Sequence, residues 1–213
     1  MDELNAVIDL SHYNQNLDFS QIKNAGGILG VIHKATQGIT WVDPTYEDHM
    51  TKALGEGLLW GAYHFGTCSD GVEQAQHFLE VVDPVSQTLV VLDFEADPQG
   101  PGMSLEEARA FVTHINQEIG RWPMLYSGYY IKQMLGSNTD PILANCQLWL
   151  AQYGPTPVVP ANWDTWTLWQ YTNGAKGPLP HDVPGAGLCD RDKFNGDQSG
   201  LEQLWSMTQP EQT

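Results

Sequence analysis

Basic residues are scarce in this chain of 213 residues. Nine Lys and Arg stand against 26 Asp and Glu, which gives a formal net charge of −17. Nucleic acids and anionic membrane surfaces are both captured through basic side chains that neutralise their phosphates. The charge balance therefore argues against nucleic acid and against a membrane as partners.

Long apolar runs are missing as well. No stretch reaches the length of about 18 apolar residues that a membrane-spanning helix needs. The first residues, Met1–Asn5, have neither the basic region nor the apolar core of a secretory signal peptide. We expect a soluble chain that is synthesised without a recognisable signal peptide.

Motifs for metals, phosphates and serine nucleophiles are also absent. The three cysteines (Cys68, Cys146 and Cys189) form no C-x-x-C pair, so free or buried thiols are favoured over a disulfide framework or a zinc site. The seven His show no H-E-x-x-H spacing, and neither G-x-x-x-x-G-K nor G-x-G-x-x-G occurs. The G-x-S-x-G nucleophile elbow is missing too. We expect neither a metal nor a cofactor.

What the sequence does contain is an alternation of apolar strands and amphipathic helices over its first two thirds. We expect helices over Phe19–Ala25, from Asp43-Pro44 to Gly55 or Gly57, from Asp70 to about Val82, from Ser104 to Ile119, over Tyr129–Leu135 and over Gly200–Met207. The predicted strands are Ala6–Leu10, Leu29–Lys34, Leu59–Phe65, Thr88–Asp97, Pro123–Ser127, Gln147–Tyr153, Thr167–Tyr171 and Leu188–Asp190.

This order predicts an α/β fold, a modified (β/α) TIM-like barrel of about eight strands that lacks helices in its last third. The connection from Tyr153 to Trp166 contains proline and has no room for a typical helix. No linker or internal repeat divides the chain. We therefore predict one catalytic barrel domain over residues 1–213, with its core at about 6–207 and no separate wall-binding domain.

Two acids end the most apolar of the strands. Leu89–Leu92 runs into Asp93 and Glu95, which share one face of an extended strand because they are two residues apart. Burial and mutual repulsion push the pKa values of such a pair apart and leave one proton donor and one anion. An isolated D-x-E is more often a solvated strand end, so its surroundings decide its meaning.

Further polar and aromatic residues stand near the carboxyl ends of the other strands. In α/β barrels these ends meet at one mouth, which carries the chemistry. Acids there can move protons, and Tyr or Trp rings can stack on the apolar faces of sugars. A carbohydrate therefore suits this mouth better than a phosphate ligand. The residues expected there are Asp9, Lys34, Tyr63, Asp93, Glu95, Tyr126, Gln152, Gln170 and Asp190.

Seven short blocks, taken together and in order, resemble glycoside hydrolase family 25, the lysozymes or N-acetylmuramidases of phage endolysins, bacteria and fungi. The resemblance covers about residues 6–195. The blocks are Val7-Ile-Asp-Leu-Ser-His-Tyr-Asn14, Lys34-Ala-Thr-Gln-Gly38, Gly61-Ala-Tyr-His-Phe65, Leu92-Asp-Phe-Glu95, Leu125-Tyr-Ser-Gly128, Leu148-Trp-Leu-Ala-Gln-Tyr153 and Leu168-Trp-Gln-Tyr171.

The resemblance implies hydrolysis of the β-1,4 bond between N-acetylmuramic acid and N-acetylglucosamine in peptidoglycan. Glu95 matches the catalytic acid/base of the family. Asp93 matches the carboxylate that assists either the acetamido group of the substrate or a water molecule. Asp9 matches an aspartate at the floor of the site, and Asp190 matches the aspartate of the late V-D-x-N-x-F signature.

Three positions depart from the family pattern. Gln37 stands where many relatives carry Glu, Cys189 replaces the usual aliphatic residue, and Asp192 replaces the usual Asn of the late signature. Asp190 and Asp192 also belong to the run Asp-Arg-Asp-Lys, which is compatible with a solvated charge cluster.

A second group of residues is expected to bind substrate. The tyrosines in it are equally compatible with core positions that have a satisfied hydroxyl, and the tryptophan with core or rim packing. The histidines His12, His33 and His64 are expected to be hydrogen-bonded structural residues. The substrate-binding candidates are Lys34, Tyr63, Tyr126, Trp149, Gln152, Gln170 and Tyr171.

Two other functions remain open at this point. One is a chitinase-like D-x-E glycosidase, and the other is a non-catalytic glycan-binding module. For the leading interpretation we expect a monomer that acts on bacterial peptidoglycan in the cell wall, periplasmic or extracellular. Without a signal peptide it would be released by phage lysis or by a non-classical secretion route, and delivery machinery or an immunity protein are further possible partners.

Overall fold

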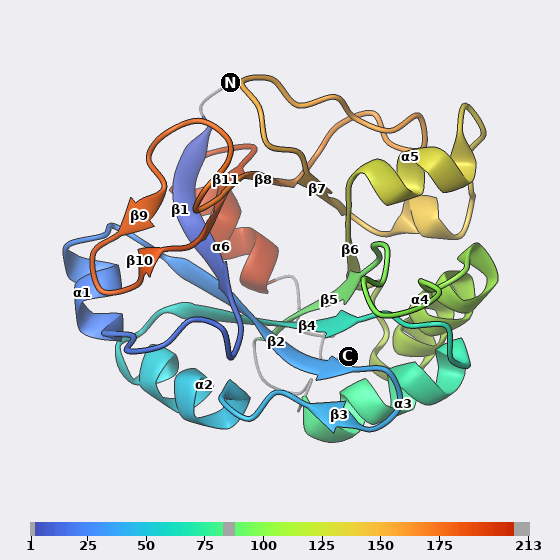
Figure 1. Ribbon diagram of the computed structural model, residues 1–213, viewed down its shortest axis with the longest axis horizontal. Coiled ribbons are helices and arrows are strands. Elements are labelled where there is room, and N and C mark those ends of the chain that lie inside the picture. The colour runs from blue at the N-terminus through green and yellow to red at the C-terminus, as the bar shows by residue number, and fades with distance from the viewer. Residues whose placement is uncertain (1–2, 83–87, 207–213) are drawn as a thin grey trace.

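Eight strands close into a barrel at the centre of the molecule (Figure 1). The computed structural model describes residues 3–82 and 88–206. Seven barrel strands run parallel, and each hydrogen-bonds to its neighbours in the ring. They are β1 (Leu4–Leu10), β2 (Gly30–Gln37), β4 (Leu59–Phe65), β5 (Leu89–Asp93), β6 (Met124–Ser127), β7 (Leu148–Ala151) and β8 (Leu168–Asn173).

The eighth strand, β11 (Asp190–Phe194), runs antiparallel between β1 and β8 and closes the ring. The predicted modified (β/α) barrel of about eight strands is therefore confirmed. The prediction of the last strand was wrong in its extent, because Leu188–Asp190 divides between β10 (Gly187–Leu188) and β11. Charges at Arg191 and Lys193 conceal β11 in the sequence, although Arg191 is buried.

Helices cover the outside of the barrel only as far as β7 (Figure 1). The helix bounds agree with the capping signals of the sequence at most ends. Ser104 and Glu107 form the predicted capping box, and Asp18 and Asp70 cap their helices. The helices are α1 (Phe19–Asn24), α2 (Tyr46–Gly55), α3 (Gly71–Val81), α4 (Leu105–Ile119), α5 (Tyr129–Leu135) and α6 (Gln198–Ser206), with a 3-10 turn η1 at Leu143–Asn145.

Two local predictions were wrong. Helix α2 begins at Tyr46 after Thr45 rather than at Asp43-Pro44, because the Asp43 carboxylate accepts hydrogen bonds from Thr45 and His12 instead of capping the helix. The strand predicted over Thr88–Asp97 ends at Asp93, so Glu95 lies on the loop that follows. Two short strands were not predicted, since each has only two residues: β3 (Trp41–Val42), which pairs with β2, and β9 (Asp182–Val183), which pairs with β10.

A tryptophan-rich connection replaces the helix between β7 and β8. Trp163 donates a hydrogen bond from its indole to the carbonyl of Cys146, and Trp169 donates to the carbonyl of Gln152. Trp166 packs on the same outer face. These large side chains cover the strands that a helix would otherwise cover, which confirms the predicted helix-free last third of the barrel wall.

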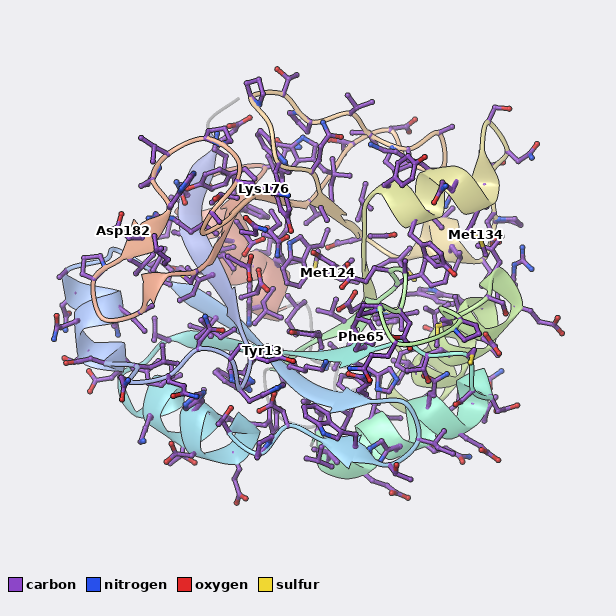
Figure 2. The ribbon with its side chains drawn as sticks, viewed as in Figure 1. Tyr13, Phe65, Met124, Met134, Lys176 and Asp182 are labelled. Carbon is purple, nitrogen blue, oxygen red and sulfur yellow. The ribbon has the colours of Figure 1, made fainter. Side chains whose placement is uncertain are left out.

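The core has an inner and an outer layer because strand residues alternate between the two faces of the barrel wall. Ile8 and Leu10 face outward to α1, whereas Val7 faces inward. Met124 lies near the centre of the ring (Figure 2). Helix α6 adds Leu201, Leu204 and Trp205 to the inner layer, so apolar side chains fill the amino-terminal half of the barrel.

None of the described helices is long and apolar enough to cross a membrane. Cys68, Cys146 and Cys189 are free thiols.

Candidate active site

A polar pocket opens at the carboxyl ends of the barrel strands, above the apolar inner layer. It encloses about 340 Å³ and takes side chains from β1, β4, β5, β6, β7, β8 and β11 and from the loops that follow them. This is the position at which (β/α) barrels carry their chemistry. The lining residues are Asp9, Tyr63, Asp93, Glu95, Tyr126, Trp149, Tyr153, Gln170, Asn173 and Asp190.

Strand register brings the acids together from distant parts of the sequence. Asp9 on β1 lies directly opposite Asp190 on β11. On the other side of the ring, Asp93 pairs with Phe65 and Tyr126 of the adjacent strands. All four carboxyl groups predicted to be catalytic therefore line one pocket, which Glu95 reaches from two residues beyond the end of β5.

Asp93 and Glu95 both line the pocket. Asp93 is 6% exposed, and its Oδ1 atom has no hydrogen-bond donor among the described residues. Burial raises the pKa of Asp93 well above its ordinary value, and the charge of Glu95 raises it further. Burial also raises the pKa of Glu95, and Lys34 opposes that rise. The pocket thus holds an acid that keeps its proton to higher pH than a solvated glutamate.

Lys34 lies beside this pair without lining the pocket. Its ammonium donates a hydrogen bond to Gln37 Oε1 at 2.7 Å and lies 4.7 Å from the ring centroid of Phe65. Burial lowers the pKa of Lys34, while the charge of Asp93 favours its protonated form. Lys34 therefore contributes a positive field on the acids rather than a direct contact with a molecule in the pocket.

Gln170 organises the floor of the pocket. Its Oε1 atom accepts hydrogen bonds from the hydroxyls of Tyr126 at 2.9 Å and Tyr153 at 3.0 Å. Its Nε2 atom then donates to Asp9 Oδ2 at 2.7 Å. Because both lone pairs of the amide oxygen are used by phenols, the amide nitrogen is directed at Asp9.

The remaining candidates divide into three environments. Tyr63 and Tyr126 line the pocket, and Trp149 lines it from a buried position, with its indole donating to Asp192 Oδ1 at 2.7 Å. Gln152 lies outside this pocket. Tyr171 lies on the outer face of the barrel wall, where its hydroxyl accepts from Asn5 and donates to the carbonyl of Pro180. Tyr171 is thus not brought to the site.

Gln152 lies instead in a second hollow of about 470 Å³ that adjoins the first. The two share Glu95, Tyr126 and Tyr153, so they form one continuous depression. Apolar surface and tyrosine rings dominate the second hollow, where Tyr129 is 74% exposed. Such a lining suits the apolar face of a sugar ring.

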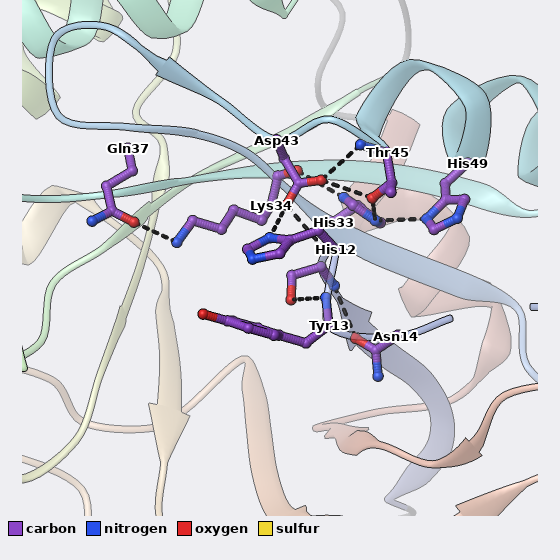
Figure 3. A network of polar contacts seen from close by, with 10 residues as sticks. His12, Tyr13, Asn14, His33, Lys34, Gln37, Asp43, Thr45 and His49 are labelled. Carbon is purple, nitrogen blue, oxygen red and sulfur yellow. Dashed lines mark hydrogen bonds and ion pairs between the residues drawn. The ribbon is translucent and has the colours of Figure 1, made fainter. Parts of the chain in front are cut away.

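An aromatic rim lies beside Lys34, whose ammonium is 5.0 Å from the ring centroid of Trp41. Tyr13 is 81% exposed, and its ring packs at a tilt against His12, with ring centroids 4.1 Å apart. The His12 ring is held by Asp43 at 2.8 Å, and Asp43 is in turn held by Thr45 (Figure 3). The rim is therefore built on a buried polar network.

The histidines of this region are internal. His33 contacts the carbonyl of Lys34 through one ring nitrogen and His49 through the other (Figure 3). His64 bridges Thr36 and Gln74. These contacts agree with the structural roles predicted for His33 and His64. Among the described residues, no cluster of three or more His, Cys, Asp or Glu is arranged to hold a metal ion.

Three residues at the site were not predicted as candidates. Tyr153 and Asn173 line the pocket from the ends of β7 and β8, and Asp192 lies buried beneath it. Position just after a strand was a usable signal for Tyr153 and Asn173. The signal for Asp192 was weaker, because the charged run around it masks the strand.

Comparisons with known proteins agree on one family. The family model described as "Glycosyl hydrolases family 25" matches residues 8–178. Lysozyme M1 from Streptomyces globisporus is 31% identical over 216 residues, which cover 94% of this chain and 71% of that protein.

Two solved structures extend the likeness to three dimensions. The bacterial lysozyme from Streptomyces coelicolor superposes with a TM-score of 0.85 at 29% identity, covering 98% of this chain and 99% of the other. A family GH25 lysozyme from Aspergillus fumigatus gives a TM-score of 0.81 at 30% identity, covering 95% and 99%.

Proposed function

The chain belongs to glycosyl hydrolase family 25 and is a glycoside hydrolase, and from this premise we propose that it is a muramidase. Its substrate is peptidoglycan, and the bond cleaved is the β-1,4 linkage between N-acetylmuramic acid and N-acetylglucosamine. The relatives named lysozyme support the substrate class. Family membership also favours an enzyme over a non-catalytic glycan-binding module.

The observation that carries the proposal is the Asp93–Glu95 pair in the acidic pocket. We assign the role of general acid to Glu95 because it matches the acid/base of the family. Burial raises the pKa of Glu95, which keeps its proton available for the oxygen of the leaving sugar. Once the bond has broken, the Glu95 carboxylate takes a proton from the incoming water. The same residue thus serves as acid and then as base.

Asp93 assists the step at the anomeric carbon. Its Oδ1 atom has no donor among the described residues, which leaves it free to accept a hydrogen bond from bound substrate or water. In one form of the mechanism it accepts the N–H of the 2-acetamido group, whose oxygen attacks the anomeric carbon. In the other it activates the water directly. Either role uses the same unoccupied acceptor.

Asp9 and Asp190 complete the floor of the site and favour the positive charge that develops on the sugar ring. Tyr63, Tyr126, Trp149 and Gln170 shape the pocket around that ring, and Gln152 contacts the next sugar in the adjoining hollow. Lys34 acts through its charge. Tyr171 has no place in the proposed substrate contacts, because its side chain faces away from the pocket.

We further propose that the barrel is a single catalytic domain and acts as a monomer on the cell wall. The pocket takes residues from Asp9 on β1 to Asp190 on β11, which supports a single domain that builds the site from the whole barrel.

The deciding experiment is digestion of purified peptidoglycan by wild type and by Glu95→Gln. Wild type should release fragments with muramic-acid reducing ends, identified by mass. Glu95→Gln should lower kcat by about 10²- to 10⁴-fold with little change in KM, because only proton transfer is lost. Glu106→Gln, at an exposed position on α4, is the matched control and should behave as wild type.

Other products would redirect the proposal. N-acetylglucosamine reducing ends would place the cut at the alternate bond. Release of sugar from chitin in preference to peptidoglycan would indicate a chitinase-like glycosidase. Binding of wild type to sacculi with no fragment released would contradict the catalytic assignment.

A further inference from the structure

The hollow that adjoins the catalytic pocket contains a cation, Lys132. This residue is half-buried on α5 and lines the hollow together with tyrosine rings and Gln152. The pocket itself is lined by carboxyl groups, aromatic rings and amides. Among the described residues, Lys132 is therefore the one basic side chain that lines either part of the depression.

Two small residues hold the wall of this hollow in place. Gly128 comes directly before α5 (Figure 1), and a Cβ atom at this position would collide with the carbonyl oxygen of Ala151 at the end of β7. Both residues line the hollow. Because the two backbones are in close contact, the first turn of α5 is fixed against β7. Lys132 is therefore placed by the packed barrel wall rather than by a free loop.

Gln152 holds the Lys132 ammonium without neutralising it. The Oε1 atom of Gln152 accepts hydrogen bonds from Lys132 Nζ at 2.9 Å and from the backbone N–H of Val158 at 3.2 Å. Its Nε2 atom donates to the carbonyl of Thr156 at 2.8 Å. An ammonium has three hydrogens, and among the described residues Lys132 has neither a second acceptor nor an acidic partner. Two of its hydrogens are therefore left for a ligand.

A substrate that carries carboxylates has few places to put them in this depression. The part of the pocket that the structure describes is lined by carboxyl groups and by no cation, so an anion is repelled there wherever those groups are ionised. Muramic acid carries a lactyl group, which ends in a carboxylate or continues into a peptide with carboxylates of its own. Because the pocket and the hollow share Glu95, Tyr126 and Tyr153, a substituent of a ring in the pocket opens into the hollow that contains Lys132.

We propose that Lys132 binds a carboxylate of the lactyl or lactyl-peptide substituent of muramic acid, and that it thereby distinguishes peptidoglycan from chitin, whose rings lack this group. The inference rests on the proposed function for the identity of the sugar in the pocket. An ammonium and a carboxylate attract each other more strongly in a partly enclosed hollow than in open water, and the hydrogen bond between them is strengthened by both charges. Lys132 is thus a specificity-determining residue outside the catalytic group.

Binding to an inactive enzyme tests the proposal without turnover. Glu95→Gln, alone or combined with Lys132→Met, is titrated with a peptide-free glycan of alternating muramic acid and N-acetylglucosamine, with the same glycan bearing its peptides, and with the peptide-free glycan converted to neutral methylamides. Lys132→Met should weaken binding of a charged glycan by about tenfold or more, because a hydrogen bond between two charges is lost. Binding of the neutral glycan should change by less than about twofold. Lys52→Met, exposed on α2, is the matched control and should leave all three affinities unchanged.

The three ligands also identify the carboxylate. A loss confined to the peptide-free glycan would assign the lactyl carboxylate, and a loss confined to the peptide-bearing glycan would assign the peptide. Equal losses on charged and neutral glycans would show that Lys132 only supports Gln152, and unchanged affinities would show that it binds no anion; either result would overturn the proposal. Digestion of peptidoglycan by wild type separates this inference from the muramidase proposal. If muramic-acid reducing ends are released while Lys132→Met binds normally, the anion site alone fails. Loss of charged-glycan binding without any digestion by wild type would contradict the muramidase proposal alone.

Discussion

Five carboxyl groups lie within and beneath one pocket, and the hydrogen bonds that they receive differ. Asp9 receives an amide hydrogen from Gln170, and Asp192 receives an indole hydrogen from Trp149. Asp93 keeps an unoccupied oxygen. A donor stabilises the charged form of an acid, whereas burial without one favours the protonated form. The carboxyl groups of this pocket therefore differ in how strongly each of them holds a proton.

Asp190 should tune the acid through its charge. Its own pKa is raised to about 6 by burial, and its charge raises the pKa of Glu95. Asp190→Asn removes that charge, so Glu95 should lose its proton at lower pH and the alkaline limb of the kcat/KM profile should move to lower pH. The measurement is a pH–rate profile on peptidoglycan, with Asp164→Asn as an exposed control. A limb that stays in place or moves to higher pH would contradict this electrostatic role.

The catalytic pair was predictable from the sequence because an apolar strand ends on it. Asp93 and Glu95 follow Leu89–Leu92 directly, and barrel strands end at the mouth. The orientation of Tyr171 was not predictable in the same way. Its strand is covered on both faces, so alternation between polar and apolar residues, which would have distinguished inward from outward positions, is absent from the sequence.

At the scale of elements, helix packing around the barrel depends on close backbone contact between α3 and α4. A Cβ atom at Gly71 would lie 2.1 Å from the carbonyl oxygen of Glu107, and backbone at this distance has to move. A Cβ atom at Gly55, the last residue of α2, would meet nothing within 4 Å. Close packing therefore excludes a side chain at Gly71, whereas the space around Gly55 would admit one.

Gly71→Ala should destabilise the protein by about 1–3 kcal/mol, the usual cost of overpacking. Gly55→Ala should be neutral or stabilise it by about 0.4–1 kcal/mol, since Ala restricts the unfolded chain and favours a helix. Chemical denaturation measures the change in the free energy of unfolding for both variants, provided that the m-value is the same as in wild type. If the two substitutions shift the midpoint equally, the α3–α4 contact is not as close as described.

Elements with local signals were predictable, whereas those defined by distant partners were not. Helix α4 begins at its capping box, and α5 has the predicted bounds. Strand β11 forms because Asp192 pairs with Val7 and Gln170 on two neighbouring strands, which no local pattern of Asp-Arg-Asp-Lys-Phe reveals. Tertiary pairing decides the structure of such a charged segment.

At the scale of the whole molecule, the net charge of −17 acts on both stability and encounter with substrate. Like charges repel one another across the folded surface and also repel a wall that carries anionic polymers. The charge is therefore poorly suited to electrostatic capture. Productive contact has to come from the pocket and its aromatic rims instead.

Salt should consequently raise the rate of lysis of anionic cell walls. Between about 0.01 M and 0.15 M ionic strength the Debye length falls from about 30 Å to about 8 Å, which screens repulsion between the wall and the enzyme surface. The rise should be smaller on peptidoglycan from which anionic polymers have been removed, and Glu95→Gln should remain inactive at every salt concentration. Turbidity clearing measures the rate on whole cell walls, and release of reducing ends measures the rate on the stripped peptidoglycan. If clearing falls steadily as salt is added, electrostatic attraction rather than repulsion must dominate the encounter. The basic residues would then have to supply that attraction, and they are few enough to be mutated one by one.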